Sequence, residues 1–198
     1  MPDQKRIHWK PFVLDNLEQI ITACQKGDLG AFTQLVHRTQ AVAFSIAFRL
    51  LQNRQEAEDL VQQAFIRIWR HLDRFDGRVN FTTWLHQIVT RLGFDQLKTR
   101  QRRNRIISQP IEDNRSTDLY TETQPEQQLH HQEFQIVLEQ SLTKLPPKQR
   151  VVFVLRDLQE LSIQEVCQIT GFSQGSVKTN LYLARKMLRQ LLDSKDLR

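Results

Sequence analysis

The chain has 198 residues, of which 39% are hydrophobic and 25% charged, with a formal net charge of +6. This composition supports a buried core and excludes a fibrous or wholly disordered chain, while the length allows one domain or two small ones. Cys24 and Cys167 cannot by themselves build a disulfide framework or a four-ligand zinc site.

The N-terminal sequence MPDQKRIHWKPF lacks the apolar stretch of a signal peptide, and no window approaches 18 apolar residues. We therefore expect no membrane insertion and a location in the reducing cytoplasm. Few glycines and prolines, together with many Leu, Gln, Arg and Ile residues, predict an all-α fold.

Apolar residues recur at helical spacing over residues 28–52, over 55–72, and from a cap at Asn80 or Thr82 onward. Three such helices predict one compact bundle over residues 28–105. The preceding N-terminal extension, residues 1–27, suggests a short packed fourth helix near Leu14–Lys26 but indicates no function.

The positive charge is concentrated in this bundle, because residues 28–105 hold 13 basic and 7 acidic side chains. The densest run is KTRQRRNR, residues 98–105, with five cations in eight residues. Such a run attracts nucleic acid by counterion release, although a solvated helix end explains it equally well.

Residues 106–126 show no sustained apolar period, and residues 106–124 carry four acidic groups and one basic group. We expect an acidic flexible linker there, since about twenty residues is long for a connection inside one domain. Residues 127–198 follow as a second small domain of shorter helices, near 127–144, 148–158, 162–169 and 173–192.

The last two of these helices have the pattern of a helix-turn-helix. Ser162 and Glu165 form a capping box, Gly171 permits the turn, and Ser173 caps the second helix. In this motif the start of the second helix enters the DNA major groove, although a plain helical hairpin shares part of the pattern. The polar side chains placed there are Gln174, Ser176, Lys178, Thr179 and Asn180, with Arg185 one turn further on.

The helix at 55–72 has one apolar residue on its polar side. Ile66 shares that side with Asp59, Gln62, Gln63 and Arg70 at i, i+3, i+4, i+7 and i+11. An apolar residue ringed by amides and charges is typical of a small protein-docking patch, although a single exposed isoleucine is unremarkable.

The stretch AEDLVQQAFIRIW, followed by FTTWLHQIV, FDQLK and basic residues, resembles region 2 of bacterial RNA polymerase sigma factors. The stretch LTKLPPKQRVVFVLRDLQELSIQEVCQITGFSQGSVKTNLYLARKMLRQLL resembles their region 4. The linker is too short for region 3 of these factors, and the N-terminal extension is too short for region 1. This arrangement resembles the extracytoplasmic-function (ECF) type.

The resemblance implies a non-enzymatic subunit without cofactor or bound metal, which binds core polymerase at the β′ coiled coil and β flap and opens promoter DNA. It also implies control by an anti-sigma factor.

The residues carried over for polymerase binding are Asp59, Gln62, Gln63, Ile66 and Arg67. Those for the single-stranded −10 element are Arg74, Phe75, Arg78, Asn80, Trp84, Arg91, Asp95, Lys98 and Arg102. Those for the −35 duplex are Gln174, Ser176, Lys178, Thr179, Asn180 and Arg185.

For Phe81 and Trp84, their spacing favours core packing over stacking on a base. At several positions this chain differs from many relatives. They have Asn where this chain has Arg91, Glu where it has Gln63, Glu-Gly where it has Gln159–Glu160, and Arg where it has Asn180. The promoter sequence therefore does not follow from the resemblance.

Two other functions are compatible with the sequence. A repressor or activator could carry the same helix-turn-helix, although no dedicated dimerisation heptads are present. An enzyme is less favoured, because no zinc-ligand spacing or phosphate-binding glycine loop occurs. The histidines are scattered at His8, His37, His71, His86, His130 and His131.

Overall fold

The computed structural model describes residues 17–107 and 136–193, and within these ranges the secondary structure is helical with no strands. The predicted all-α class is confirmed. Most of the expected linker, residues 108–126, and the first 16 residues lie outside the described part of the chain.

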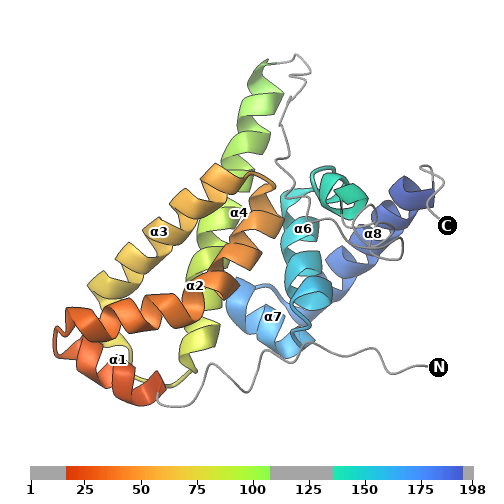
Figure 1. Ribbon diagram of the computed structural model, residues 1–198. Helices are drawn as coiled ribbons and strands as arrows, with labels where there is room; N and C mark the ends of the chain where they lie inside the picture. The colour runs from red at the N-terminus through yellow and green to blue at the C-terminus, as the bar shows by residue number, and fades with distance from the viewer. Residues whose placement is uncertain (1–16, 108–135, 194–198) are drawn as a thin grey trace, which may run out of the picture.

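Residues 17–107 contain four α-helices (Figure 1). They are α1 (Leu17–Gln25), α2 (Leu29–Leu51), α3 (Arg54–His71) and α4 (Phe81–Ile107), with a 3₁₀ turn, η1 (Leu72–Arg74), after α3. The basic run is thus entirely helical, and α4 continues two residues beyond the expected start of the linker.

Of the helix expected near 127–144, residues 136–142 are helical, and residues 127–135 lie outside the described part of the chain. The chain then continues with α6 (Pro147–Phe153), a π-helical turn η2 (Val154–Leu158), α7 (Ile163–Thr170) and α8 (Gln174–Asp193). The sequence predicted one uniform helix over 148–158, whereas the Gln159 N–H bonds the Val154 carbonyl and so widens the last turn.

Side-chain caps set several of the helix boundaries. The Asn53 side chain accepts a hydrogen bond from Glu56 N and begins α3, while Asn80 accepts one from Thr83 N at the start of α4. Both halves of the Ser162–Glu165 capping box are present. Gly171 ends α7 at a φ of 72°, in the left-handed region where glycine is favoured.

The core of the first half is built around α2, which α1, α3 and α4 surround (Figure 1). Leu35, Ile46 and Leu50 of α2 are fully buried. Helix α4 crosses closely at Gly93, where a Cβ atom would lie 2.8 Å from Cδ1 of Leu50. A larger residue at position 93 would therefore require the Leu50 side chain to shift.

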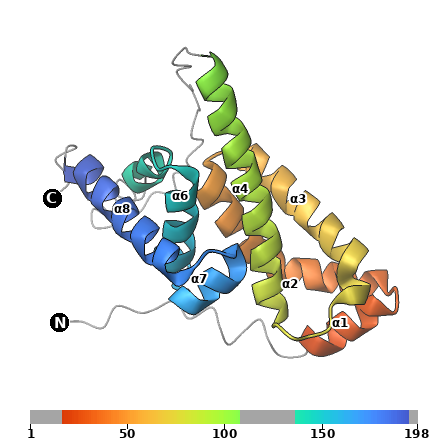
Figure 2. The ribbon, with the colours of Figure 1, turned by 180° about the vertical axis from the view of Figure 1, so that it is seen from behind.

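The two helical domains pack against each other, with α6 and α7 beside α4 (Figure 2) and η2 beside α2. The Arg150 Nη1 donates to the Leu50 carbonyl at 2.9 Å, and the Arg49 Nη1 donates to the Leu158 carbonyl at 2.8 Å. The Gln159 amide donates to Ser45 Oγ at 3.2 Å. These bonds join positions about a hundred residues apart and orient the second domain on the first.

Arg150 is the most deeply buried of these linking side chains, with 5% of its surface exposed. Its guanidinium also donates to the carbonyls of Thr143 and Leu145. We expect Arg150→Ala to lower the free energy of unfolding by about 2–4 kcal/mol, because it leaves buried carbonyls without donors. Urea denaturation measures the loss, and the exposed Arg103→Ala serves as the charge-matched control. Equal stabilities of the two variants would contradict this role.

His86 of α4 is 2% exposed, and burial lowers its pKa from 6.5 to about 4, although the nearby Glu165 charge acts in the opposite direction. The folded state therefore favours the neutral imidazole. Between pH 6.5 and about 4 the unfolded chain binds the additional proton, so stability is retained above pH 6.5 and falls as the pH decreases.

We expect the free energy of unfolding to decrease between pH 6.5 and 4 more steeply for the wild-type chain than for His86→Phe. The excess decrease should approach about 3 kcal/mol, the free-energy equivalent of the pKa shift. Denaturation at half-unit pH steps measures it, and the variant corrects for the carboxylates that titrate in the same range. Parallel pH profiles would be inconsistent with a buried neutral His86.

Candidate nucleic-acid and protein interfaces

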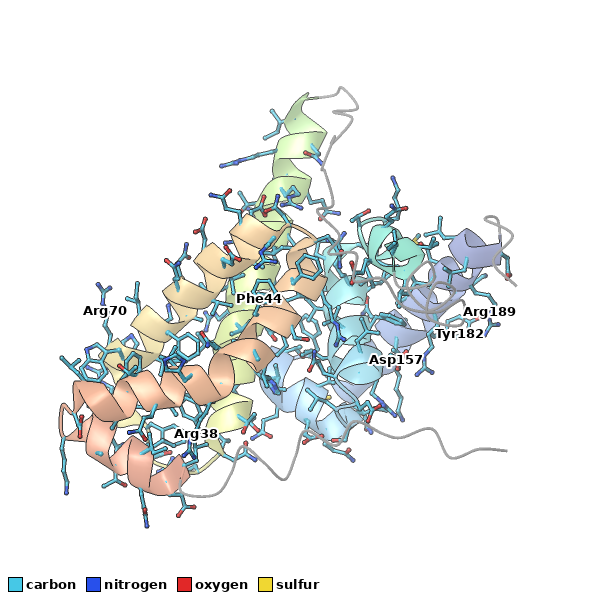
Figure 3. The ribbon with its side chains drawn as sticks, in the orientation of Figure 1. Arg38, Phe44, Arg70, Asp157, Tyr182 and Arg189 are labelled. Carbon is cyan, nitrogen blue, oxygen red and sulfur yellow. The ribbon has the colours of Figure 1, made fainter. Side chains whose placement is uncertain are left out.

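One side of α3 is buried and the opposite side faces solvent. The buried side consists of Ala57, Leu60, Ala64, Phe65 and Ile68. All five residues that the resemblance assigned to polymerase binding are exposed on the opposite side: Asp59, Gln62, Gln63, Ile66 and Arg67. Ile66 is 53% exposed, and Arg70 continues this face one turn further (Figure 3). The structure therefore brings these residues together as one polar face with an apolar residue in it.

The loop between α3 and α4, residues 72–80, is anchored at both ends. At its start the Gln25 amide donates to the carbonyls of Leu72 and Phe75, and at its end Asn80 caps α4. In the middle the Asp76 carboxylate accepts from Arg78 N and pairs with the Arg78 guanidinium at 3.0 Å. Arg74, Arg78 and Asn80 are all exposed, so the loop presents two cations and an amide to solvent.

Phe75 packs beside α4 in an aromatic cluster. Its ring centroid lies 5.1 Å from Trp84 and 6.0 Å from Phe81. Phe81 is buried, as its spacing predicted, while Trp84 is half-buried. Trp84 therefore contributes to packing and still keeps part of its ring surface accessible.

The remaining −10 candidates form a stripe along α4. Arg91, Asp95, Lys98 and Arg102 are spaced by four, three and four residues and are all exposed. Lys98 Nζ lies 4.2 Å from the Phe94 ring centroid. Arg100, from the same basic run, instead pairs with Glu56 of α3 and is half-buried. Only part of the basic run is therefore exposed and accessible to a binding partner.

The beginning of α8 presents three of the −35 candidates to solvent. Gln174, Lys178 and Thr179 are exposed, whereas Ser176 and Asn180 are half-buried. The Asn180 amide donates to the Ser176 carbonyl at 2.8 Å. Asn180 therefore directs its amide donor to its own helix, and its side chain would have to turn to read adenine with that group.

Further along α8, Arg185 is held in a two-pronged ion pair. Its Nε and Nη2 donate to the two carboxylate oxygens of Asp157 at 2.7 and 2.6 Å, which raises the Arg185 pKa. Asp157, labelled in Figure 3, lies in η2, so the pair joins α8 to the π turn. Tyr182 and Arg189 lie along the outer side of α8 in the same view, and both are exposed.

In the part of the chain that the structure describes, no group of three His, Cys, Asp or Glu side chains could hold a metal ion. None of the described helices combines the length and apolar character needed to cross a bilayer.

Three long-range contacts are not predicted by the sequence: the Gln25 bonds to the loop, the Arg150 bond to α2, and the Arg185–Asp157 pair. Each joins residues at least 28 positions apart. Neither residue type nor helical periodicity signals such a partner, so no feature of the single sequence could have identified them.

Residues 35–103 match the family model for Sigma-70 region 2, and residues 135–188 match that for Sigma-70, region 4. The chain is also 31% identical over 181 residues to the ECF RNA polymerase sigma factor SigW of Bacillus subtilis, covering 89% of this chain and 96% of that relative. The chain belongs to the ECF branch of the sigma-70 family. Its function is that of a sigma factor, promoter-specific initiation of transcription by RNA polymerase.

Further relatives agree with this ECF sigma factor assignment. The ECF RNA polymerase sigma-E factor of Escherichia coli K12 is 30% identical over 173 residues, which cover 85% of this chain and 90% of that protein. In fold, the chain is similar to the sigma factor RpoE in complex with the anti-sigma factor NepR from Bartonella quintana. The TM-score is 0.63 at 23% identity, over 82% of this chain and 96% of that one. It is also similar to CnrH in complex with the cytosolic domain of CnrY, with a TM-score of 0.61 at 26% identity over 89% and 96% of the two chains.

The Arg185–Asp157 pair leads to a test of DNA binding by α8. Asp157→Asn should release Arg185 for phosphate, tighten binding to duplex DNA at low salt, and steepen the logarithmic salt dependence by about one unit. Fluorescence anisotropy over a salt series measures the slope. The control is Asp193→Asn, which changes an exposed acid of α8 and alters the net charge by the same amount. If both variants have the same slope, Arg185 is not withheld from DNA by Asp157.

Proposed function

We propose that this sigma factor binds core RNA polymerase through the exposed face of α3, with the β′ coiled coil as its partner. The support is the combination of Ile66, 53% exposed, with amides and charges around it on a helix whose other side is buried. An apolar anchor inside a polar rim is the usual composition of a protein-binding hot spot. Region 4 would in addition contact the β flap.

The −10 element is bound, in this proposal, as a single strand by the loop 72–80 and the stripe on α4. Arg74, Arg78, Lys98 and Arg102 supply cations for the phosphates. The accessible part of the Phe75–Trp84 cluster supplies a surface for an unstacked base. Asp95 lies between Arg91 and Lys98 on the α4 stripe, and its carboxylate is suited to accept a hydrogen bond from a base.

The −35 element is read in the major groove by the start of α8. Gln174, Lys178 and Thr179 are the exposed side chains there and can reach base edges and phosphates without rearrangement. Asn180 and Arg185 join them when their present bonds to Ser176 and Asp157 are exchanged for bonds to DNA.

Binding both elements at once requires the two domains to separate. About 25 base pairs at 3.4 Å each place the elements roughly 85 Å apart along the duplex. The 28 residues from 108 to 135 can span at most about 100 Å when extended. The bonds of Arg49, Arg150 and Gln159 between the domains would therefore break when the protein engages a promoter.

We also propose that an anti-sigma factor controls this protein in the cytoplasm and that it performs no catalysis of its own. Two solved structures with the same fold are complexes of a sigma factor with an anti-sigma factor and of CnrH with the cytosolic domain of CnrY. A partner that stabilises the contact between the domains would keep the two DNA-binding surfaces from reaching a promoter together.

Affinity capture with core polymerase tests the central claim. Changing Asp59, Gln62 and Ile66 together to Ala should weaken retention at least tenfold, because the apolar anchor and part of its polar rim are lost. The matched control changes Glu18, Gln19 and Leu29 to Ala, which removes an exposed acid, amide and apolar residue from α1 and α2. Transcription of a genomic library with core polymerase then identifies the promoter.

Failure of the wild-type chain to bind core polymerase would contradict the proposed function and favour a DNA-binding regulator without polymerase contact. Retention of the α3 variant at the control level would contradict the assignment of this face.

A further inference from the structure

Helix α1 precedes the residues that match the sigma region 2 model, which begin at residue 35. Leu17, Ile20, Ile21 and Cys24 are buried, so the helix is firmly attached to the first domain. Gln25, its last residue, is exposed and directs its side chain to the loop that follows α3. The end of α1 is thus held close to a segment about 50 positions further along the chain.

The Gln25 amide nitrogen bonds both ends of one turn. Its Nε2 lies 3.0 Å from the Leu72 carbonyl oxygen and 2.8 Å from the Phe75 carbonyl oxygen. A primary amide nitrogen carries two hydrogens, so each carbonyl receives one donor. The same turn is closed by the Phe75 N–H, which donates to the Leu72 carbonyl at 3.1 Å.

This turn determines where the −10 loop begins. Phe75 leaves it in an extended conformation and packs on Trp84, which fixes the first aromatic of the loop against α4. The bonds of Asp76 and Asn80 restrain the middle and the end of the loop from within the segment 76–83. Gln25 supplies a restraint on its start from a different helix.

We propose that Gln25 is a positioning residue for promoter opening: it holds the start of the loop 72–80 so that Arg74, Phe75 and Arg78 meet the displaced −10 strand. This inference rests on the proposed role of the loop in binding that strand. Gln25 touches no base in this scheme. Its effect appears in the opening step, after the −35 duplex has been bound by α8.

Two variants remove the contact in different ways. Gln25→Glu keeps the shape of the side chain but places carboxylate oxygens against two carbonyl oxygens, and Gln25→Leu removes the donor without adding charge. Gln19→Glu is the matched control, since it makes the same change at an exposed position of the same helix.

The experiment uses the full chain with core polymerase on the promoter recovered from the genomic library. A 2-aminopurine base in the −10 element reports the rate of opening at saturating polymerase, and the concentration dependence of that rate gives the initial binding constant. We expect both Gln25 variants to open the promoter about fivefold more slowly, as the loss of roughly one hydrogen bond's net stabilisation predicts, with initial binding unchanged. Affinity for a single-stranded −10 oligonucleotide should fall by a similar factor.

The inference is overturned if both Gln25 variants open the promoter as fast as Gln19→Glu. It is also overturned if their thermal midpoints and initial binding fall together with the opening rate, because Gln25 would then only stabilise the domain. A wild-type complex that opens no promoter would instead refute the proposed function itself, so the two failures are distinguishable.

Discussion

The carbonyl groups at the end of α2 accept hydrogen bonds from both domains, and the packing of the two domains depends on these bonds. The last carbonyls of a helix have no partner within it, and those of Leu50 and Leu51 lie in the interior of the molecule. Arg150 of the second domain donates to Leu50, and Arg100 of α4 donates to Leu51. Two guanidinium groups thus lie at the negative end of the helix dipole and satisfy acceptors that would otherwise be buried without donors.

This arrangement leaves the candidate binding faces on the outside. The apolar sides of α3 and α4 are buried against α2, and the apolar side of α8 is buried against α6 and α7. The polar sides of these three helices therefore remain accessible while the domains are in contact. Contact between the domains leaves these surfaces uncovered and restricts the distance over which they can act together.

Several of the predicted DNA-binding groups are engaged with the protein itself. Arg78 pairs with Asp76, Arg185 with Asp157, and the Asn180 amide bonds its own helix. In the proposed DNA complex these residues exchange partners, so we expect each to contribute less to binding than Lys178 or Gln174, which are exposed. A difference of this kind cannot be inferred from residue type.

Much of the fold followed from local sequence signals. The cap at Asn80, the Ser162–Glu165 capping box and the Gly171 turn depend on groups three or four residues apart, which a sequence displays directly. The exposure of Ile66 followed from the period of α3 in the same way. The short α1 was also expected, within the segment Leu14–Lys26.

The sequence by itself determined which residues form helices, which side of each is apolar, and which family the motifs resemble, because these properties depend on neighbours within one or two turns. Only the tertiary structure decided that Arg150 bonds α2, that Gln25 bonds the loop at Leu72, and that Asp157 holds Arg185. These contacts join residues 28 to 100 positions apart. Their partners are set by how the helices pack. A polar side chain can form several different hydrogen bonds, and the neighbouring sequence does not show which of them it forms.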